Sequence, residues 1–192
     1  MAFDNKTARG DAGEALRISR EMGRTYLPPT SAPPSFKMLD RERQKALAAW
    51  AAALIPREGD WPSAEDAGAA AYADNCAALS PVLRRALIAA IDEASRLAAE
   101  RGCDFASLEP DAQVATLTTI DQEQSELFTL VLELVFEGYY RHPRVQRVIE
   151  RRTGYEPAVA VSGIEQEPFD PATLDRVREL PRRVRSAPEE SR

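Results

Sequence analysis

One stretch constrains the fold more than any other: residues 124–141, QSELFTLVLELVFEGYYR. Drawn as an α-helix, it carries apolar side chains around most of its circumference, so almost no face of it suits water. Such a helix needs other helices on several sides. The stretch therefore predicts the central helix of an all-α domain, and it ends before Pro143 because proline lacks the N–H that a continuing helix would use.

Further segments have the spacing and end signals of helices that would surround this central one. Leu47, Trp50 and Leu54 form one apolar stripe within residues 40–55. Ser63 and Asp66 fit the capping-box pattern S-x-x-[DE], which predicts a helix from Ser63 to about Leu79. Proline just inside a helix start and acceptor side chains at the N-cap predict helices that begin at Ser80, Glu109, Pro143 and Asp170.

The two ends of the chain differ from its middle. Residues 1–38 include LPPTSAPPSF, whose four prolines favour an extended backbone; GEALRISREMG allows a short helix before it. Residues 154–192 predict an extended segment, a short helix and a basic tail. With residues 39–153 as the helical domain, we predict an all-α fold: a compact bundle of about five to six helices with extended N-terminal and C-terminal arms.

Composition and charge exclude several classes of protein. The formal net charge of −6 argues against a nucleic-acid-binding protein, and we interpret the basic stretch at residues 176–186 as a solvated tail rather than an anion site. The apolar run LFTLVL is far shorter than the roughly 20 residues of a membrane-spanning helix. Cys76 and Cys103 form no C-x-x-C motif, so we favour two buried thiols over a disulfide.

Motifs for catalysis and cofactor binding are missing from the sequence. It contains no G-x-G-x-x-G and no P-loop, so no phosphate cradle for a dinucleotide is predicted. His142 is the only histidine, which rules out the Glu-x-x-His pairs of di-metal bundles. Glu126, Glu133 and Glu137 share neighbouring turns, and we interpret them as a polar strip or as ion-pair partners. We therefore predict no catalytic, cofactor-binding or metal site in this chain.

The end of the predicted central helix holds the best candidates for contact with another protein. His142 would hydrogen-bond the last carbonyls or the loop backbone there, where a cation suits the helix dipole. For Tyr139 and Tyr140, chemistry alone favours packing at the edge of the core, although such rings are also typical of interfaces. Neighbouring residues on a helix point about 100° apart. We therefore expect one tyrosine to pack inside and the other to meet a partner or a neighbouring loop, with either assignment open.

Several short motifs follow one another in an informative order. They are LIP at 54–56, DFASLEPDAQ at 104–113, and GYYRHP followed by GY between 138 and 155. Their order and spacing resemble the gluconate 2-dehydrogenase subunit 3 family, over about residues 47–163. That family consists of the small, helical subunits of heteromeric flavin-dependent dehydrogenases.

The resemblance implies a function for the chain. The large partner would hold FAD and the catalytic residues in a glucose-methanol-choline type oxidoreductase fold, and would oxidise alcohol groups of sugars, polyols or sugar acids. A cytochrome c subunit often accepts the electrons. This chain would bind no cofactor, and would wrap and stabilise or mature the flavoprotein. The candidate interface residues are Trp61, Tyr139, Tyr140, Arg141, His142 and Tyr155.

Two other functions stay open at this point. One is a stand-alone helical ligand-binding or regulatory module; the other is a free-standing enzyme that uses a carboxylate with Tyr139 or Tyr140. The resemblance also bears on location, because members commonly begin with a twin-arginine signal. Residues 1–30 have neither paired arginines nor an apolar stretch. We therefore expect a cytoplasmic protein, or a periplasmic one if a signal was removed or the chain is exported with its partner.

Overall fold

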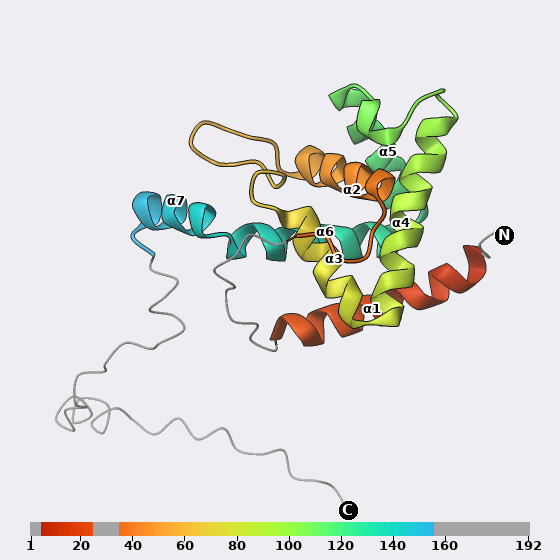
Figure 1. The fold of residues 1–192 in the computed structure, drawn as a ribbon, viewed down its shortest axis with the longest axis horizontal. Helices are drawn as coiled ribbons and strands as arrows, with labels where there is room; N and C mark the ends of the chain where they lie inside the picture. Colours follow the sequence, from red (N-terminus) through yellow and green to blue (C-terminus); the bar gives the residue numbers. More distant parts are fainter. Residues whose placement is uncertain (1–4, 25–34, 156–192) are drawn as a thin grey trace, which may run out of the picture. The chain divides into compact units, whose positions relative to one another are not determined.

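The computed structural model describes residues 5–24 and 35–155, and the regular elements of these ranges are all helices (Figure 1). This confirms the all-α class. The described residues belong to one compact unit, Met1–Tyr155. The predicted helix at Asp170 and the basic tail lie outside the described residues. The elements are α1 (Asn5–Arg24), α2 (Arg41–Leu54), α3 (Ala69–Leu79), α4 (Pro81–Ala99), the 3₁₀-helix η1 (Phe105–Ser107), α5 (Pro110–Glu123), α6 (Ser125–Arg141) and α7 (Pro143–Thr153).

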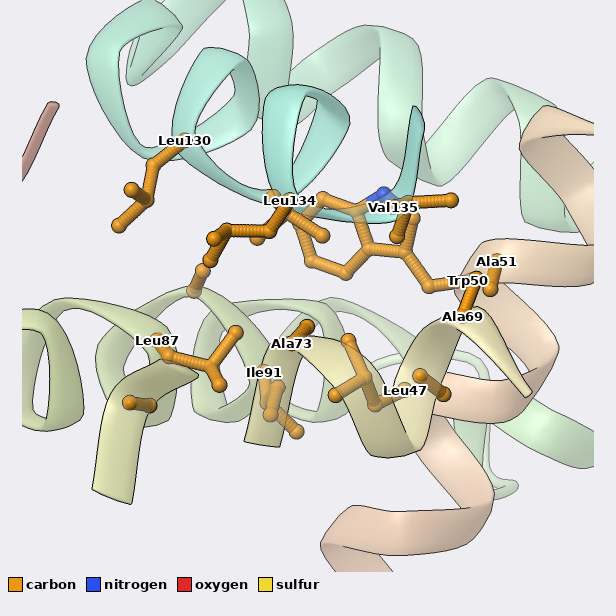
Figure 2. Close-up of a cluster of buried hydrophobic side chains, with 14 of the residues drawn as sticks. Leu47, Trp50, Ala51, Ala69, Ala73, Leu87, Ile91, Leu130, Leu134 and Val135 are labelled. Atoms are coloured by element: carbon orange, nitrogen blue, oxygen red, sulfur yellow. The ribbon is translucent and has the colours of Figure 1, made fainter. Parts of the chain in front are cut away.

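The helix α6 is central, as its sequence predicts. It packs against α1, α3, α4, α5 and α7. Figure 2 shows Leu134 and Val135 of α6 next to the ring of Trp50 from α2. Trp50 is fully buried and also lies against Phe105 and Phe128, with ring centroids 6.4 and 6.3 Å away. The other buried residues of α6 continue this core along α3 and α4; they are Leu127, Leu130, Val131, Gly138 and Tyr139.

Two predicted helix starts are confirmed in atomic detail. The side chain of Asp40 accepts a hydrogen bond from the N–H of Arg43, at 2.9 Å, and caps α2. Ser80 caps α4 in the same way, with Pro81 as the first helical residue. Both caps satisfy N–H groups that a helix leaves free at its first turn.

The short helix that GEALRISREMG allows is present and is longer than expected, so the expectation of an extended N-terminal arm is wrong for residues 5–24. These residues form α1, which packs on α4 and α6. Ala15 is fully buried and Leu16 nearly so, while Arg20 reaches Glu133 of α6 at 2.7 Å. The buried face of α1 consists of Ala12, Ala15, Leu16 and Ser19. Most of the stability of such a helix comes from tertiary packing, which the sequence alone does not show. The prolines at 28, 29, 33 and 34 lie outside the described residues.

The predicted start of the next helix at Ser63 is also wrong, although the capping box itself forms. The N–H of Asp66 donates to Ser63 Oγ and the N–H of Ser63 donates to the Asp66 carboxylate, both at 3.0 Å. These bonds close a turn, and α3 begins only at Ala69. The reason is Gly68, whose φ of 65° is left-handed and interrupts the helix. Residues between α2 and α3 therefore form a loop that reaches the end of α6.

Candidate partner interface

The end of α6 is held in place by its close approach to α3. A Cβ atom at Gly138 would lie 2.8 Å from the Cβ of Tyr72, closer than real Cβ contacts come. Only glycine therefore fits at this crossing. The approach fixes the last turn of α6, which carries the tyrosines.

His142 is both the C-cap of α6 and the N-cap of α7. Its backbone N–H donates to the carbonyl of Tyr139 at 3.0 Å, and its Nδ1 accepts from the N–H of Arg144 at 3.3 Å. Burial lowers the pKa of His142, and the nearby charges of Arg144 and Arg147 lower it further. The imidazole is thus a neutral acceptor, so the expectation of a favourable cation at this helix end is wrong. As a neutral acceptor it satisfies one of the N–H groups that the first turn of α7 leaves free.

Tyr139 is the tyrosine that packs inside. It is 3% exposed, and its hydroxyl donates to the carbonyl of Pro62 at 3.0 Å. Burial, with a smaller contribution from Tyr140, raises its pKa, so the hydroxyl stays a donor. The bond fastens the loop between α2 and α3 to the end of α6.

Tyr140 is the tyrosine that points outward, with 51% of its surface exposed. Its ring is stacked on Phe136, one helical turn earlier, with centroids 6.1 Å apart and planes at 10°. The buried ring of Tyr139 meets it at 5.3 Å and 79°. Two neighbouring rings thus hold the exposed ring in one orientation. Sequence reasoning left the assignment of the two tyrosines open, and their burial decides it.

Arg141 is turned toward α3 rather than away from the bundle. It pairs with Glu137 at 2.7 Å, and its guanidinium lies 5.7 Å from the centre of the Tyr72 ring. Burial raises the pKa of Tyr72, and it raises that of Cys76 to about 11. Both groups are therefore protonated near neutral pH and are poor nucleophiles. The contact of Arg141 with the Tyr72 ring stabilises the crossing of α3 and α6.

Trp61 and Tyr155 lie near the C-terminal end of α7, which is its far end as seen from α6. Trp61 is half-buried, and the guanidinium of Arg152 lies 5.6 Å from its ring centre. Asp60 next to it pairs with Arg152 and also with Arg151, at 3.3 Å, and the bond from Arg152 lowers the pKa of Asp60. Tyr155 is exposed and follows the glycine that ends α7. The candidates thus form two groups, one at each end of α7.

Sequence reasoning missed three residues at the near end of α7, its N-terminal end next to α6. Phe136 supplies the ring under Tyr140, and Arg144 and Arg147 are exposed on α7. Within residues 5–24 and 35–155, the side chains of these arginines have no hydrogen bond or ion pair. The i, i+4 spacing of Phe136 and Tyr140 and the i, i+3 spacing of the arginines were the available signals.

The described part of the chain offers few other sites. No group of three or more His, Cys, Asp or Glu side chains in it is arranged to hold a metal ion. None of its helices is long and apolar enough to cross a membrane. Cys76 and Cys103 are both free thiols, the first buried and the second half-buried.

Comparison with known proteins gives one match. The family model described as gluconate 2-dehydrogenase subunit 3 matches residues 41–159, which include α2 to α7 and hence both groups of candidate residues. Comparisons with curated proteins and with solved structures give no significant match.

Proposed function

Since the chain belongs to the gluconate 2-dehydrogenase subunit 3 family, we propose that it is the non-catalytic small subunit of a flavin-dependent dehydrogenase complex. In this complex it binds the large subunit and stabilises or matures it. The large subunit holds FAD and oxidises an alcohol group of a sugar, polyol or sugar acid. The observation that carries the proposal is the family match, which extends over more than half of the chain.

The geometry of the candidate interface supports this role. Tyr140 is an exposed ring held rigid by its neighbours, and rigid aromatic side chains contribute strongly to protein interfaces at a low cost in conformational entropy. The residues that fix it, Tyr139 and Gly138, are buried. A subunit that stabilises a partner needs such a surface on a stable scaffold.

Co-expression tests the proposal directly. The tagged chain is produced with a flavin-dependent dehydrogenase large subunit from the same organism, and each protein is also produced alone. We expect the two chains to elute as one species, with FAD bound, and the large subunit to have a higher Tm and a higher FAD content than when it is produced alone. Separate elution, with unchanged FAD content and Tm, would refute the proposal.

The chain produced alone provides the second arm of the experiment. We expect it to oxidise no sugar, polyol or sugar acid with an artificial electron acceptor, whether or not FAD is added. Turnover by the isolated chain that is lost in Tyr140→Phe would instead support a free-standing enzyme.

A further inference from the structure

The near end of α7 combines an aromatic surface with unpaired positive charge. Tyr140 and Arg144 are four residues apart, on either side of the turn at His142, so at most about 14 Å of chain separates them. Arg144 and Arg147 lie in the first turns of α7, which begins at Pro143 directly after His142. We name the set Phe136, Tyr140, Arg144 and Arg147 the corner surface.

The two arginines of the corner surface differ from the other arginines nearby. Arg151 and Arg152 pair with Asp60, and Arg141 pairs with Glu137. Arg144 and Arg147 have no such partner in the described part of the chain. Exposed guanidinium groups that no carboxylate neutralises are available to a carboxylate from outside.

The charge of α7 also contrasts with that of the whole chain. The helix has four arginines and one glutamate, whereas the chain has a formal net charge of −6. Its inner side is apolar, with Val145 and Val148 buried, and α6 is its main packing partner among the described helices (Figure 1). The helix thus presents a local basic face on an acidic protein, which suits a local acidic partner surface.

We propose that the corner surface binds a carboxylate-bearing segment of the dehydrogenase large subunit. Tyr140, supported by Phe136, packs against an apolar or aromatic side chain of this segment. Arg144 and Arg147 pair with its carboxylates. This inference rests on the proposed function, and adds to it the contact residues and the chemistry of the partner.

A protein segment fits the corner surface better than a polyanion or a bilayer does. The formal net charge of −6 of the whole chain disfavours binding of a long polyanion or of an anionic membrane. The exposed apolar part of the surface is one pair of stacked rings. That area is a typical anchor in a protein interface and is small for insertion into lipid.

Charge reversal tests the inference in the full chain. Arg144→Glu with Arg147→Glu should weaken binding to the purified large subunit by at least about tenfold, and should make the affinity less sensitive to salt. The matched control is Arg41→Glu with Lys45→Glu, two exposed positions on α2 with the same change in net charge. We expect this control to bind within about twofold of the wild type.

Substitution of Tyr140 tests the aromatic part. Tyr140→Ala should also lose about tenfold in affinity, while Tyr140→Phe, which keeps the ring, should bind like the wild type. Circular dichroism and Tm identify variants that fail to fold. For such a variant, protection of Arg144 and Arg147 from phenylglyoxal in the wild-type complex is the replacement measurement, and the absence of protection overturns the inference.

The outcomes separate this inference from the proposed function. If the wild type binds the large subunit and both charge-reversal variants bind equally well, the corner surface is not the contact and the subunit role stands. If the wild type does not bind, the subunit role fails and the inference fails with it. Binding of phosphatidylglycerol vesicles or of duplex DNA that depends on Arg144 and Arg147, with the large subunit unaffected, would also overturn the inference.

Discussion

The helix α3 and the corner surface differ in the size and exposure of their side chains. Five of the 11 residues of α3 are buried alanines, and α6 meets this helix at a glycine. The corner surface consists of two large rings and two exposed arginines. The first region depends on side chains that are small enough to let helices touch. The second depends on side chains that are large, rigid and charged.

We therefore expect α3 to contribute to the stability of the protein and the corner surface to contribute to binding of the large subunit. Changes around α3 should lower the free energy of unfolding and leave the affinity of a folded variant for the large subunit unchanged. Changes at the corner surface should do the reverse. The first three predictions concern mainly buried residues, in order of decreasing effect. The fourth concerns the turn at His142, which joins the α6 and α7 parts of the corner surface.

The largest effect is expected at Asp74, the buried carboxylate of α3. It accepts hydrogen bonds from the backbone N–H groups of Lys37, Met38 and Leu39. Asp74→Ala leaves these donors unpaired and should cost about 3 kcal/mol or more, measured by urea denaturation. Asp74→Asn keeps one acceptor oxygen, so its loss should be smaller. Equal losses for the two variants would contradict this account.

Gly138→Ala tests the close approach of α3 and α6, and Gly13→Ala on α1 serves as its comparison. At Gly138 the added Cβ meets the Cβ of Tyr72 at 2.8 Å, so Gly138→Ala should destabilise the protein by about 2 kcal/mol. At Gly13 the nearest atom is the carboxylate oxygen of Glu126 at 3.3 Å, the end of a flexible side chain. Gly13→Ala should therefore stabilise the protein by up to about 1 kcal/mol. The same sign for both changes in denaturation midpoints would refute the packing argument.

Removal of the two tyrosine hydroxyls compares a buried position of α6 with the adjacent exposed position, which belongs to the corner surface. Tyr139→Phe loses the hydrogen bond to the Pro62 carbonyl and should cost about 1 kcal/mol. Tyr140→Phe changes an exposed group and should stay within about 0.5 kcal/mol of the wild type. A larger loss at Tyr140 in thermal unfolding would mean that its hydroxyl has a structural role.

The smallest effect is a pH dependence that comes from His142, the chain's single histidine. Its pKa is lowered in the folded state, so the unfolded state binds the proton more readily. Its contribution to stability is fully present above the unfolded pKa of about 6.5, and is lost as the pH falls through the folded pKa.

His142→Asn keeps a good N-cap residue and removes this titration. Wild type and variant should therefore diverge between about pH 7.5 and 5.5, with the wild type losing more stability as the pH falls. Parallel stability curves over this range would contradict the neutral-acceptor role of His142.

Local signals explain which parts of the fold the sequence predicted. Asp40 and Ser80 are caps whose function depends on the next three residues, and both helix starts are confirmed. The apolar circumference of α6 is also a local property, and its central position follows from it. The Ser63 capping box formed, yet Gly68 decided where α3 begins, because the left-handed φ of one residue outweighs a capping pattern.

Tertiary contacts explain what the sequence left open. The assignment of Tyr139 and Tyr140 was left open, although Tyr140 lies seven residues after Glu133 and hence on the same side of α6. The inward position of Tyr139 depends on a loop carbonyl 77 residues earlier in the chain. The need for glycine at 138 comes from Tyr72 on another helix. The arginines of α7 could be found by their spacing, but whether each has an acidic partner depends on the position of Asp60.

The shared cap at His142 has a mechanical consequence. Because α6 ends and α7 begins at this one residue, the direction of α7 is set by a single pair of backbone dihedral angles. With 11 residues, α7 is about 16 Å long, so a rotation of 20° at His142 would move its far end by about 5 Å. The ion pairs of Arg151 and Arg152 with Asp60 oppose this rotation at the far end, where they have the greatest leverage. The ion pairs of Asp60 with Arg151 and Arg152 thus help to set the angle between α7 and α6. This angle determines the direction in which Arg144 and Arg147 point.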